Sequence, residues 1–146
     1  MARAYASTVV PASADEVWAL LRDFNSLPSW LPIASSSEIE NGKAGDQVSA
    51  VRVLGEHRIR ERLVTMSDRD RCFSYTMPEP IFPIKNHLAT MRVTPVTDAG
   101  HAMVEWSATF DAQWDEVDHW EQYMSNEVFA PGLTALKQRW TEPAAV

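Results

Sequence analysis

The chain has 146 residues, of which 20 are acidic and 13 basic, so its formal net charge is −7. That length suits a single domain, which we expect to span residues 1–146, and a composition with 45% hydrophobic and 23% charged residues is typical of a folded soluble protein. The acidic balance opposes contact with nucleic-acid phosphates, so nucleic acid is not an expected partner.

The lone cysteine, Cys72, excludes an internal disulfide, and there is no pair of cysteines to suggest a structural zinc. The N-terminal sequence MARAYASTVV lacks the apolar run of a signal peptide, and no later segment is apolar over the length of a membrane span. We therefore expect a cytoplasmic protein with no metal, no cofactor and no membrane insertion.

The first predicted elements are a strand and a helix. The opening RAYASTVVP is rich in strand-forming residues, and Pro11 ends the strand. SADEVWALLRDF then offers a serine cap, an acidic first turn and an apolar stripe at Val17, Leu20 and Leu21, which together predict a helix. The following NSLPSWLPIASS contains two prolines and four serines and allows only a short helical turn.

Six more strands are predicted, followed by one long helix. The strands are separated by turn signals such as NGKAGD, SDRD and TDAG, and their expected ranges are 35–40, 46–54, 57–66, 71–77, 86–95 and 102–112. Short turns between successive strands favour an antiparallel meander. The helix is expected from about Asp115 to Trp140, with a kink at Pro131-Gly132. This order predicts an α+β fold in which a seven-stranded antiparallel sheet curves around the C-terminal helix.

The stretch GEHRIRERLV, residues 55–64, is unusually rich in charge. Side chains alternate between the two faces of a strand, so Arg58, Arg60 and Arg62 are expected on one face. The other face then carries Glu61 between two aliphatic residues. A carboxylate in that position must be paired, hydrated or used in the function.

Two later strands supply further candidates. In NHLATMRV, alternation places His87, Ala89, Met91 and Val93 on the inner face. In MVEWSATF, the same rule groups Met103, Glu105, Ser107 and Thr109, and we expect these to face inward. Trp106 and Phe110 favour the opposite phase of this strand, so its orientation stays open.

Five segments, taken in order, resemble the helix-grip superfamily, which includes birch-allergen-like proteins, START lipid-transfer domains and bacterial polyketide cyclases. They are VVPASADEVWALLRDFNSLPSWLP, IENGKAGDQVSAVRV, RERLV, FSYTM and VEWSATFD, and they look most like the polyketide cyclase/dehydrase branch and its plant hormone-receptor relatives. The resemblance covers essentially the whole chain. It implies a small, apolar ligand in an internal cavity between the sheet and the long helix.

The resemblance places Glu61, Tyr75, His87 and Glu105 at cavity-lining positions. It also shows two departures from the plant receptors: Ser35 stands where they use a lysine to hold a ligand carboxylate, and only LGEH stands where they carry a longer gating loop. These differences argue against a hormone-receptor role.

Carboxylates, an imidazole and a phenol in an apolar cavity are suited to acid/base chemistry, because burial shifts their pKa values. Glu61, His87 and Glu105 are therefore the candidate catalytic residues for an enolisation, a cyclisation with dehydration or an elimination that needs no cofactor. In the alternative interpretation the same residues bind ordered water or one another and only orient the ligand, as in a non-catalytic binding or lipid-transfer protein.

The remaining candidates bind the ligand, which we expect to be a small hydrophobic or aromatic molecule. Those predicted for the cavity wall or its rim are Tyr75, Ser35, Trp30, Ile81, Phe82, Met91, Met103, Trp120 and Met124. A third interpretation is a regulator that binds a protein partner through the arginine face and an exposed Trp106. The chain is expected to be a monomer or a homodimer.

Overall fold

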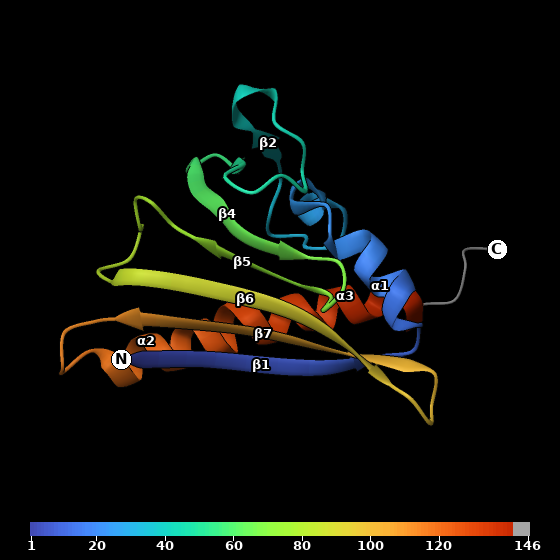
Figure 1. Cartoon of the computed structure of the whole chain (residues 1–146). Coiled ribbons are helices and arrows are strands. Elements are labelled where there is room, and N and C mark those ends of the chain that lie inside the picture. Colours follow the sequence, from blue (N-terminus) through green and yellow to red (C-terminus); the bar gives the residue numbers. More distant parts are fainter. Residues whose placement is uncertain (142–146) are drawn as a thin grey trace.

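The computed structural model describes residues 1–141, so the end of the expected domain, residues 142–146, lies outside the described residues. Its strands are β1 (Ala2–Val10), β2 (Ser37–Ile39), β3 (Val51–Leu54), β4 (Ile59–Ser67), β5 (Cys72–Thr76), β6 (Lys85–Val96) and β7 (His101–Asp111). They form an antiparallel sheet in the order β1-β7-β6-β5-β4-β3-β2 (Figure 1). The predicted meander is therefore confirmed, and β1 completes the sheet beside β7.

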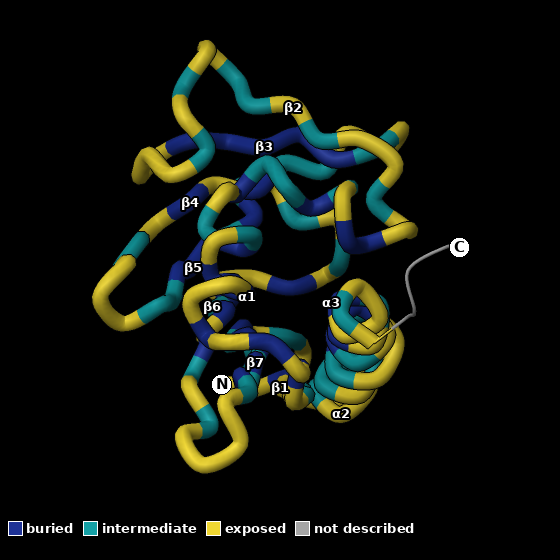
Figure 2. The backbone as a smooth tube through the Cα atoms, turned by 90° about the vertical axis from the view of Figure 1, so that its right-hand side faces the viewer, coloured by how far each residue is buried: buried dark blue, intermediate teal, exposed yellow. Residues whose placement is uncertain are grey.

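The helices fall into two groups. After β1 come α1 (Ala14–Leu21) and the 3₁₀ helix η1 (Phe24–Ser29), and a 3₁₀ turn, η2 (Glu40–Gly42), follows β2. The C-terminal helix is built from α2 (Val117–Gln122), the π-helix η3 (Tyr123–Phe129) and α3 (Ala130–Thr141). Figure 2 shows this helix beside β1 and β7, with β2 and β3 at the opposite end of the sheet.

Helix α1 forms where its sequence signals predict. The Ser13 side chain accepts a hydrogen bond from the Glu16 N–H at 3.2 Å, which caps the helix, and Asp15 and Glu16 lie in its first turn. Val17 and Leu21 are buried against the sheet side of the molecule. The Trp18 indole N–H donates to Asp68 at 2.8 Å, so the helix is also tied to the turn after β4.

The turn between β3 and β4 is longer than predicted. Residues 55–58 form this turn, and its ends, Gly55 and Arg58, both have positive φ angles, of 63° and 53°. Strand β4 consequently begins at Ile59. The prediction that Arg58 shares a sheet face with Arg60 and Arg62 is therefore wrong.

The C-terminal helix passes through the Pro131-Gly132 interruption without ending. Proline has no N–H, and its ring clashes with the carbonyl four residues earlier in an α-helix. The seven-residue π-helix η3 lies immediately before this point, between Tyr123 and Phe129. Its wider turns accommodate the change in hydrogen bonding that Pro131 requires.

The same helix protects the exposed edge of β1. The Arg3 N–H donates to Glu121 Oε2 at 2.8 Å, and the Tyr5 N–H donates to Ser125 Oγ at 3.0 Å. Glu121 and Ser125 are one helical turn apart, so they meet alternate N–H groups of the strand. An unpaired strand edge is in this way satisfied within the molecule.

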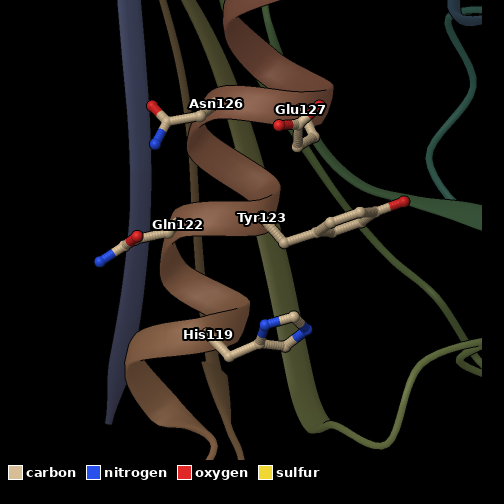
Figure 3. A pocket seen from close by; sticks show the side chains of 5 residues that line it. All are labelled: His119, Gln122, Tyr123, Asn126 and Glu127. Atoms are coloured by element: carbon tan, nitrogen blue, oxygen red, sulfur yellow. The ribbon is translucent and has the colours of Figure 1, made fainter.

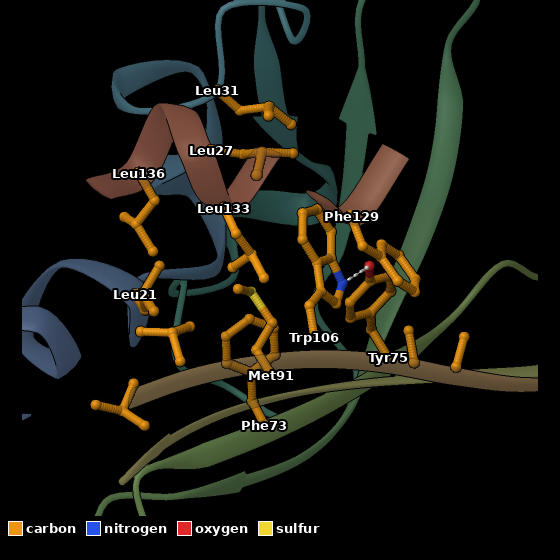
Figure 4. Packing of buried hydrophobic residues seen from close by; sticks show 14 of the residues in the cluster. Leu21, Leu27, Leu31, Phe73, Tyr75, Met91, Trp106, Phe129, Leu133 and Leu136 are labelled. Atoms are coloured by element: carbon orange, nitrogen blue, oxygen red, sulfur yellow. Dashed lines mark hydrogen bonds between the residues drawn. The ribbon is translucent and has the colours of Figure 1, made fainter. Parts of the chain in front are cut away.

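The core lies between the inner face of the sheet and helices α1, η1 and α3 (Figure 4). Trp106 is at its centre, stacked on Phe129 with ring centroids 4.6 Å apart and meeting the edge of Trp30 at 6.0 Å. Gly132 of α3 packs directly on the Trp106 ring, since a Cβ there would lie 2.8 Å from Trp106 Cζ3. The partner-binding interpretation needed an exposed Trp106, but this side chain is buried.

Strand β7 has the opposite phase from the one we expected. The β6–β7 register pairs Met91 with Trp106, so both point into the core. The inward side chains are Ala102, Val104, Trp106, Ala108 and Phe110. The prediction that Met103 and Glu105 face inward is therefore wrong, because the fully apolar set of this strand takes the core side.

Candidate functional site

A group of four buried polar side chains, the interior polar cluster, lies on neighbouring strands. It consists of Arg52 on β3, Glu61 beside it on β4, Tyr75 on β5 and His87 on β6. Arg52 is paired with Glu61 in the strand register, while Tyr75 faces Leu63 on one side and Ala89 on the other. The inward orientation predicted for Glu61 and His87 is confirmed by their exposures of 9% and 6%.

Arg52 and Glu61 form a buried ion pair. Arg52 Nε and Nη2 lie 2.9 and 2.8 Å from Glu61 Oε1, and Arg52 Nη1 donates to the Phe24 carbonyl oxygen at 2.8 Å. The guanidinium carbon lies 3.8 Å from the Phe24 ring centroid and 5.0 Å from that of Tyr75. The arginine is thus held by groups of the protein, and its charge balances that of Glu61.

Tyr75 connects this ion pair to the centre of the core. Its hydroxyl oxygen accepts a hydrogen bond from Trp106 Nε1 at 3.0 Å, shown as a dashed line in Figure 4. Burial, and then the nearby charge of Glu61, raise the pKa of Tyr75. The phenol therefore stays protonated and keeps a proton to donate.

His87 lies beside Tyr75, with ring centroids 6.0 Å apart. Burial lowers the pKa of His87 from its ordinary value to about 4, because the charged imidazolium loses hydration. An ordinary histidine pKa lies near neutrality, whereas the His87 imidazole is uncharged at that pH in the structure. Its Nδ1 atom is buried and has no hydrogen-bond partner within residues 1–141.

Glu105 stands apart from the cluster. It lies on the outer face of β7, where the Tyr5 hydroxyl donates to Glu105 Oε2 at 2.6 Å. This hydrogen bond raises the pKa of Tyr5. Glu105 therefore does not join Glu61 and His87 in one interior site, and the three-residue catalytic set predicted from the sequence is not brought together.

The residues predicted to bind the ligand divide between the core and the surface. Met91, Met124 and Trp30 are buried, and Phe82 contacts Trp120, with ring centroids 5.2 Å apart. The loop that carries Phe82 therefore lies against the C-terminal helix.

Two other residues predicted for the ligand site lie at the surface. Ile81 in the same loop is 52% exposed. Ser35 is exposed in the segment before β2, so it is not part of the interior.

Two pockets lie on the described surface, and neither is lined by a residue of the interior polar cluster. One, of about 260 Å³, follows the C-terminal helix and is lined by His119, Gln122, Tyr123, Asn126 and Glu127 (Figure 3). The other, of about 420 Å³, lies between η1 and α3 and is lined by Pro28, Ser29, Trp30, Pro32, Ala135, Gln138 and Arg139. The space expected to form the cavity is occupied by core side chains such as Trp106 and Phe129.

On the arginine face of β4, one side chain forms ion pairs with neighbouring segments of the same chain. Arg60 binds Glu40 at 2.7 Å and Glu79 at 3.0 Å, which ties β4 to η2 and to the loop after β5. Arg62 remains exposed. With Arg58 in a turn and Trp106 buried, the surface required by the partner-binding interpretation is not formed.

Arg52 is the site residue that the sequence reasoning missed. All four residues of β3 are buried, so this strand shows no alternation and gave no reason to single out one face. The length of the turn between β3 and β4 is the signal that could have identified Arg52. Since Leu54 pairs with Ile59, Arg52 falls directly opposite Glu61.

Within residues 1–141, no three His, Cys, Asp or Glu side chains are grouped as a metal site requires. Nor does any helix among these residues combine the length and apolar character needed to cross a membrane.

An antiparallel seven-stranded sheet held against a long C-terminal helix defines a helix-grip protein. The sequence matches the family described as "Polyketide cyclase / dehydrase and lipid transport" over residues 1–141, and the chain belongs to this family. No curated protein matches the sequence at a significant level.

Solved structures agree with this assignment. A protein from Thermobifida fusca, solved by NMR, is 38% identical with a TM-score of 0.88, over 96% of this chain and 93% of that one. The di-domain ARO/CYC BexL from the BE-7585A biosynthetic pathway is 19% identical with a TM-score of 0.78, over 94% of this chain and 46% of that one. Norcoclaurine synthase from Thalictrum flavum, in complex with dopamine and hydroxybenzaldehyde, is 18% identical with a TM-score of 0.76, over 99% and 88%. The last two similarities establish the shared fold.

Proposed function

We propose that this protein binds a small aromatic or polyketide-like molecule at the interior polar cluster and catalyses acid/base chemistry on it without a cofactor. The observation that carries the proposal is the set of buried groups with unused hydrogen-bonding capacity, Glu61, Tyr75 and His87, in an otherwise apolar interior. Family membership supports binding of a small hydrophobic ligand and is consistent with a cyclase or dehydratase role.

The proposed roles follow from the state of each group. The Glu61 carboxylate accepts a proton from a carbon next to a ligand carbonyl. Neutral His87 donates a hydrogen bond to the carbonyl oxygen as that oxygen gains negative charge, which suits a histidine whose pKa is about 4. Glu61 can then return the proton elsewhere on the ligand, which completes an isomerisation, or to a departing hydroxyl group, which completes a dehydration.

Neither of the two surface pockets described above is lined by the cluster, which supports entry of the ligand between core side chains. The cluster is least sealed at Glu61, whose side chain is 12% exposed, against 4% for Arg52. We therefore propose that the ligand approaches from the Glu61 side.

The experiment is mass spectrometry of the protein under native and then denaturing conditions, after incubation with aromatic ketones, polyketide-like aldehydes and fatty acids. A panel member that returns with a changed mass or retention time identifies the reaction. Glu61→Gln and His87→Asn should each lower turnover by roughly a hundredfold or more. Glu105→Gln, on the outer face, is the matched control and should leave turnover unchanged.

The alternative function is a non-catalytic binding or transfer protein for a similar ligand. It is favoured by the second half of the family description, lipid transport, and by the pairing of Arg52 with protein groups. In that case the ligand is recovered unchanged, and the two substitutions alter affinity alone. Turnover that survived both substitutions would also exclude the proposed roles of Glu61 and His87.

A further inference from the structure

The polar groups left free in the interior polar cluster define the kind of ligand end that fits there. The hydrogen bond from Arg52 Nε and the ion-pair contact of Nη2 are both made to the same carboxylate oxygen of Glu61, Oε1. The other oxygen, Oε2, accepts no hydrogen bond from residues 1–141. Glu61 is therefore oriented by one oxygen while the second remains an acceptor.

The positive charge of the cluster, on Arg52, is already paired with Glu61. Arg52 donates from Nε to Glu61 and from Nη1 to the Phe24 carbonyl, and its Nη2 lies 2.8 Å from Glu61 Oε1. Its face lies against the Phe24 ring, and the residue is 3% exposed. Its positive charge is balanced by the carboxylate of Glu61, so the pair has no net charge with which to attract a ligand anion. His87, being neutral, adds no cation either.

We propose that the cluster selects a ligand end that is an uncharged hydroxyl group, of the phenol or enol type, donating its hydrogen bond to Glu61 Oε2, and that it excludes carboxylates. This inference rests on the proposed function and specifies its substrate class. A hydroxyl group bound to an ionised acceptor forms a strong, charge-assisted hydrogen bond. A ligand carboxylate would instead place a second negative charge beside Glu61 with no free cation to balance it. Arg52 is the positioning residue, since it fixes Oε1 and so directs Oε2.

The test compares three probes with the same ring system: a naphthol, its methyl ether and the matching naphthoic acid, at neutral pH. Binding is followed by calorimetry on the full chain. The naphthol should bind at least about tenfold more tightly than either of the others, because only it can donate to Glu61 without adding charge.

Glu61→Gln provides the decisive variant. It removes the negative charge and releases Arg52 from its partner, so the order should invert and naphthoate should become the tightest ligand. Glu105→Gln is the control of the same chemistry on the outer face and should keep the wild-type order. Where Glu61→Gln does not fold, the three-probe comparison on the wild-type protein still decides the inference.

Results that contradict this inference can be told apart from results that contradict the proposed function. Naphthoate binding to the wild-type protein as tightly as naphthol would overturn this inference and leave the proposed function standing. Equal affinity for naphthol and its methyl ether would exclude the hydroxyl donor, and an unchanged order in Glu61→Gln would exclude Glu61 as the acceptor. If none of the probes binds, the proposed function fails and this inference fails with it.

Discussion

At the scale of single residues, the buried ion pair between Arg52 and Glu61 places Glu61 in the proposed site, and the folded state depends on both partners being present. Removing one partner leaves a buried charge without compensation, so Arg52→Met should lower the free energy of unfolding by about 3–5 kcal/mol. The double variant Arg52→Met/Glu61→Leu should recover most of that loss, because an apolar pair needs no compensation. Urea unfolding of the two variants measures the difference.

Arg60→Met is the control for removing an arginine from the same part of the sheet. The side chains of Arg60 and Glu40 are 32% and 31% exposed, so water screens their pair and the loss of stability should be much smaller than for Arg52. A double variant no more stable than Arg52→Met alone would show that the pair acts through its packing on Phe24, not through its charge.

His87 makes a second prediction, on the pH dependence of stability. Burial lowers its folded-state pKa from 6.5 to about 4, so between these values the unfolded chain binds a proton that the folded chain does not. Stability should therefore fall as the pH drops from 6.5 towards 4, by about 3 kcal/mol from this residue. His87→Gln should flatten this part of the profile in urea unfolding at a series of pH values.

His57→Gln, in the exposed turn before β4, is the control for this effect and should leave the profile as it is. An equally steep profile in His87→Gln would assign the dependence to other groups.

The sequence allowed some of these residues to be placed and not others, for physical reasons. Glu61 and His87 were placed correctly because each lies on a strand with one apolar and one polar face. Glu105 was placed wrongly because the resemblance outweighed the apolar set that includes Val104 and Trp106. Arg52 was missed because its strand is buried on both faces, and only the register of the hairpin reveals its partner.

At the scale of elements, the seam between α3 and the sheet depends on Gly132. An alanine Cβ at this position would lie 2.8 Å from Trp106 Cζ3 and 3.2 Å from Leu31 Cδ1. Overpacking of this kind costs about 1–3 kcal/mol, which the better helix propensity of alanine offsets by about 1 kcal/mol. Gly132→Ala should thus be destabilised by roughly 1 kcal/mol in urea unfolding.

Gln138→Ala, exposed on the same helix, separates the two contributions. It changes helix propensity without touching the core and should leave stability nearly unchanged. A Gly132→Ala variant more stable than the wild type would show that Trp106 yields to the added methyl group.

The element order was predictable because strand and turn signals alternate regularly along the chain, while the boundaries were not. Strand β3 begins at Val51, five residues after the predicted start at residue 46, because the residues before Val51 form turns. Nor could the π-helix η3 be predicted, because the Pro131-Gly132 pair indicates an irregularity in the helix but not its form.

At the scale of the whole molecule, the two ends of the sheet differ in how firmly they are held. Strands β1, β6 and β7 have 9, 12 and 11 residues, and the C-terminal helix covers their edge, whereas β2 and β3 have 3 and 4 residues. Amide hydrogen exchange should therefore be slowest in β6 and β7 and fastest in β2.

The interior polar cluster spans β3 to β6 and so joins the weakly held part of the sheet to the strongly held part. A ligand bound to Glu61 stabilises the folded form of β3 and β4 in proportion to its affinity and concentration. Saturating ligand should then slow exchange in β3 and β4 more than in β1, and Glu61→Gln should abolish that difference. Protection spread evenly over all strands would instead indicate that the ligand binds away from the cluster, for example in the pocket between η1 and α3.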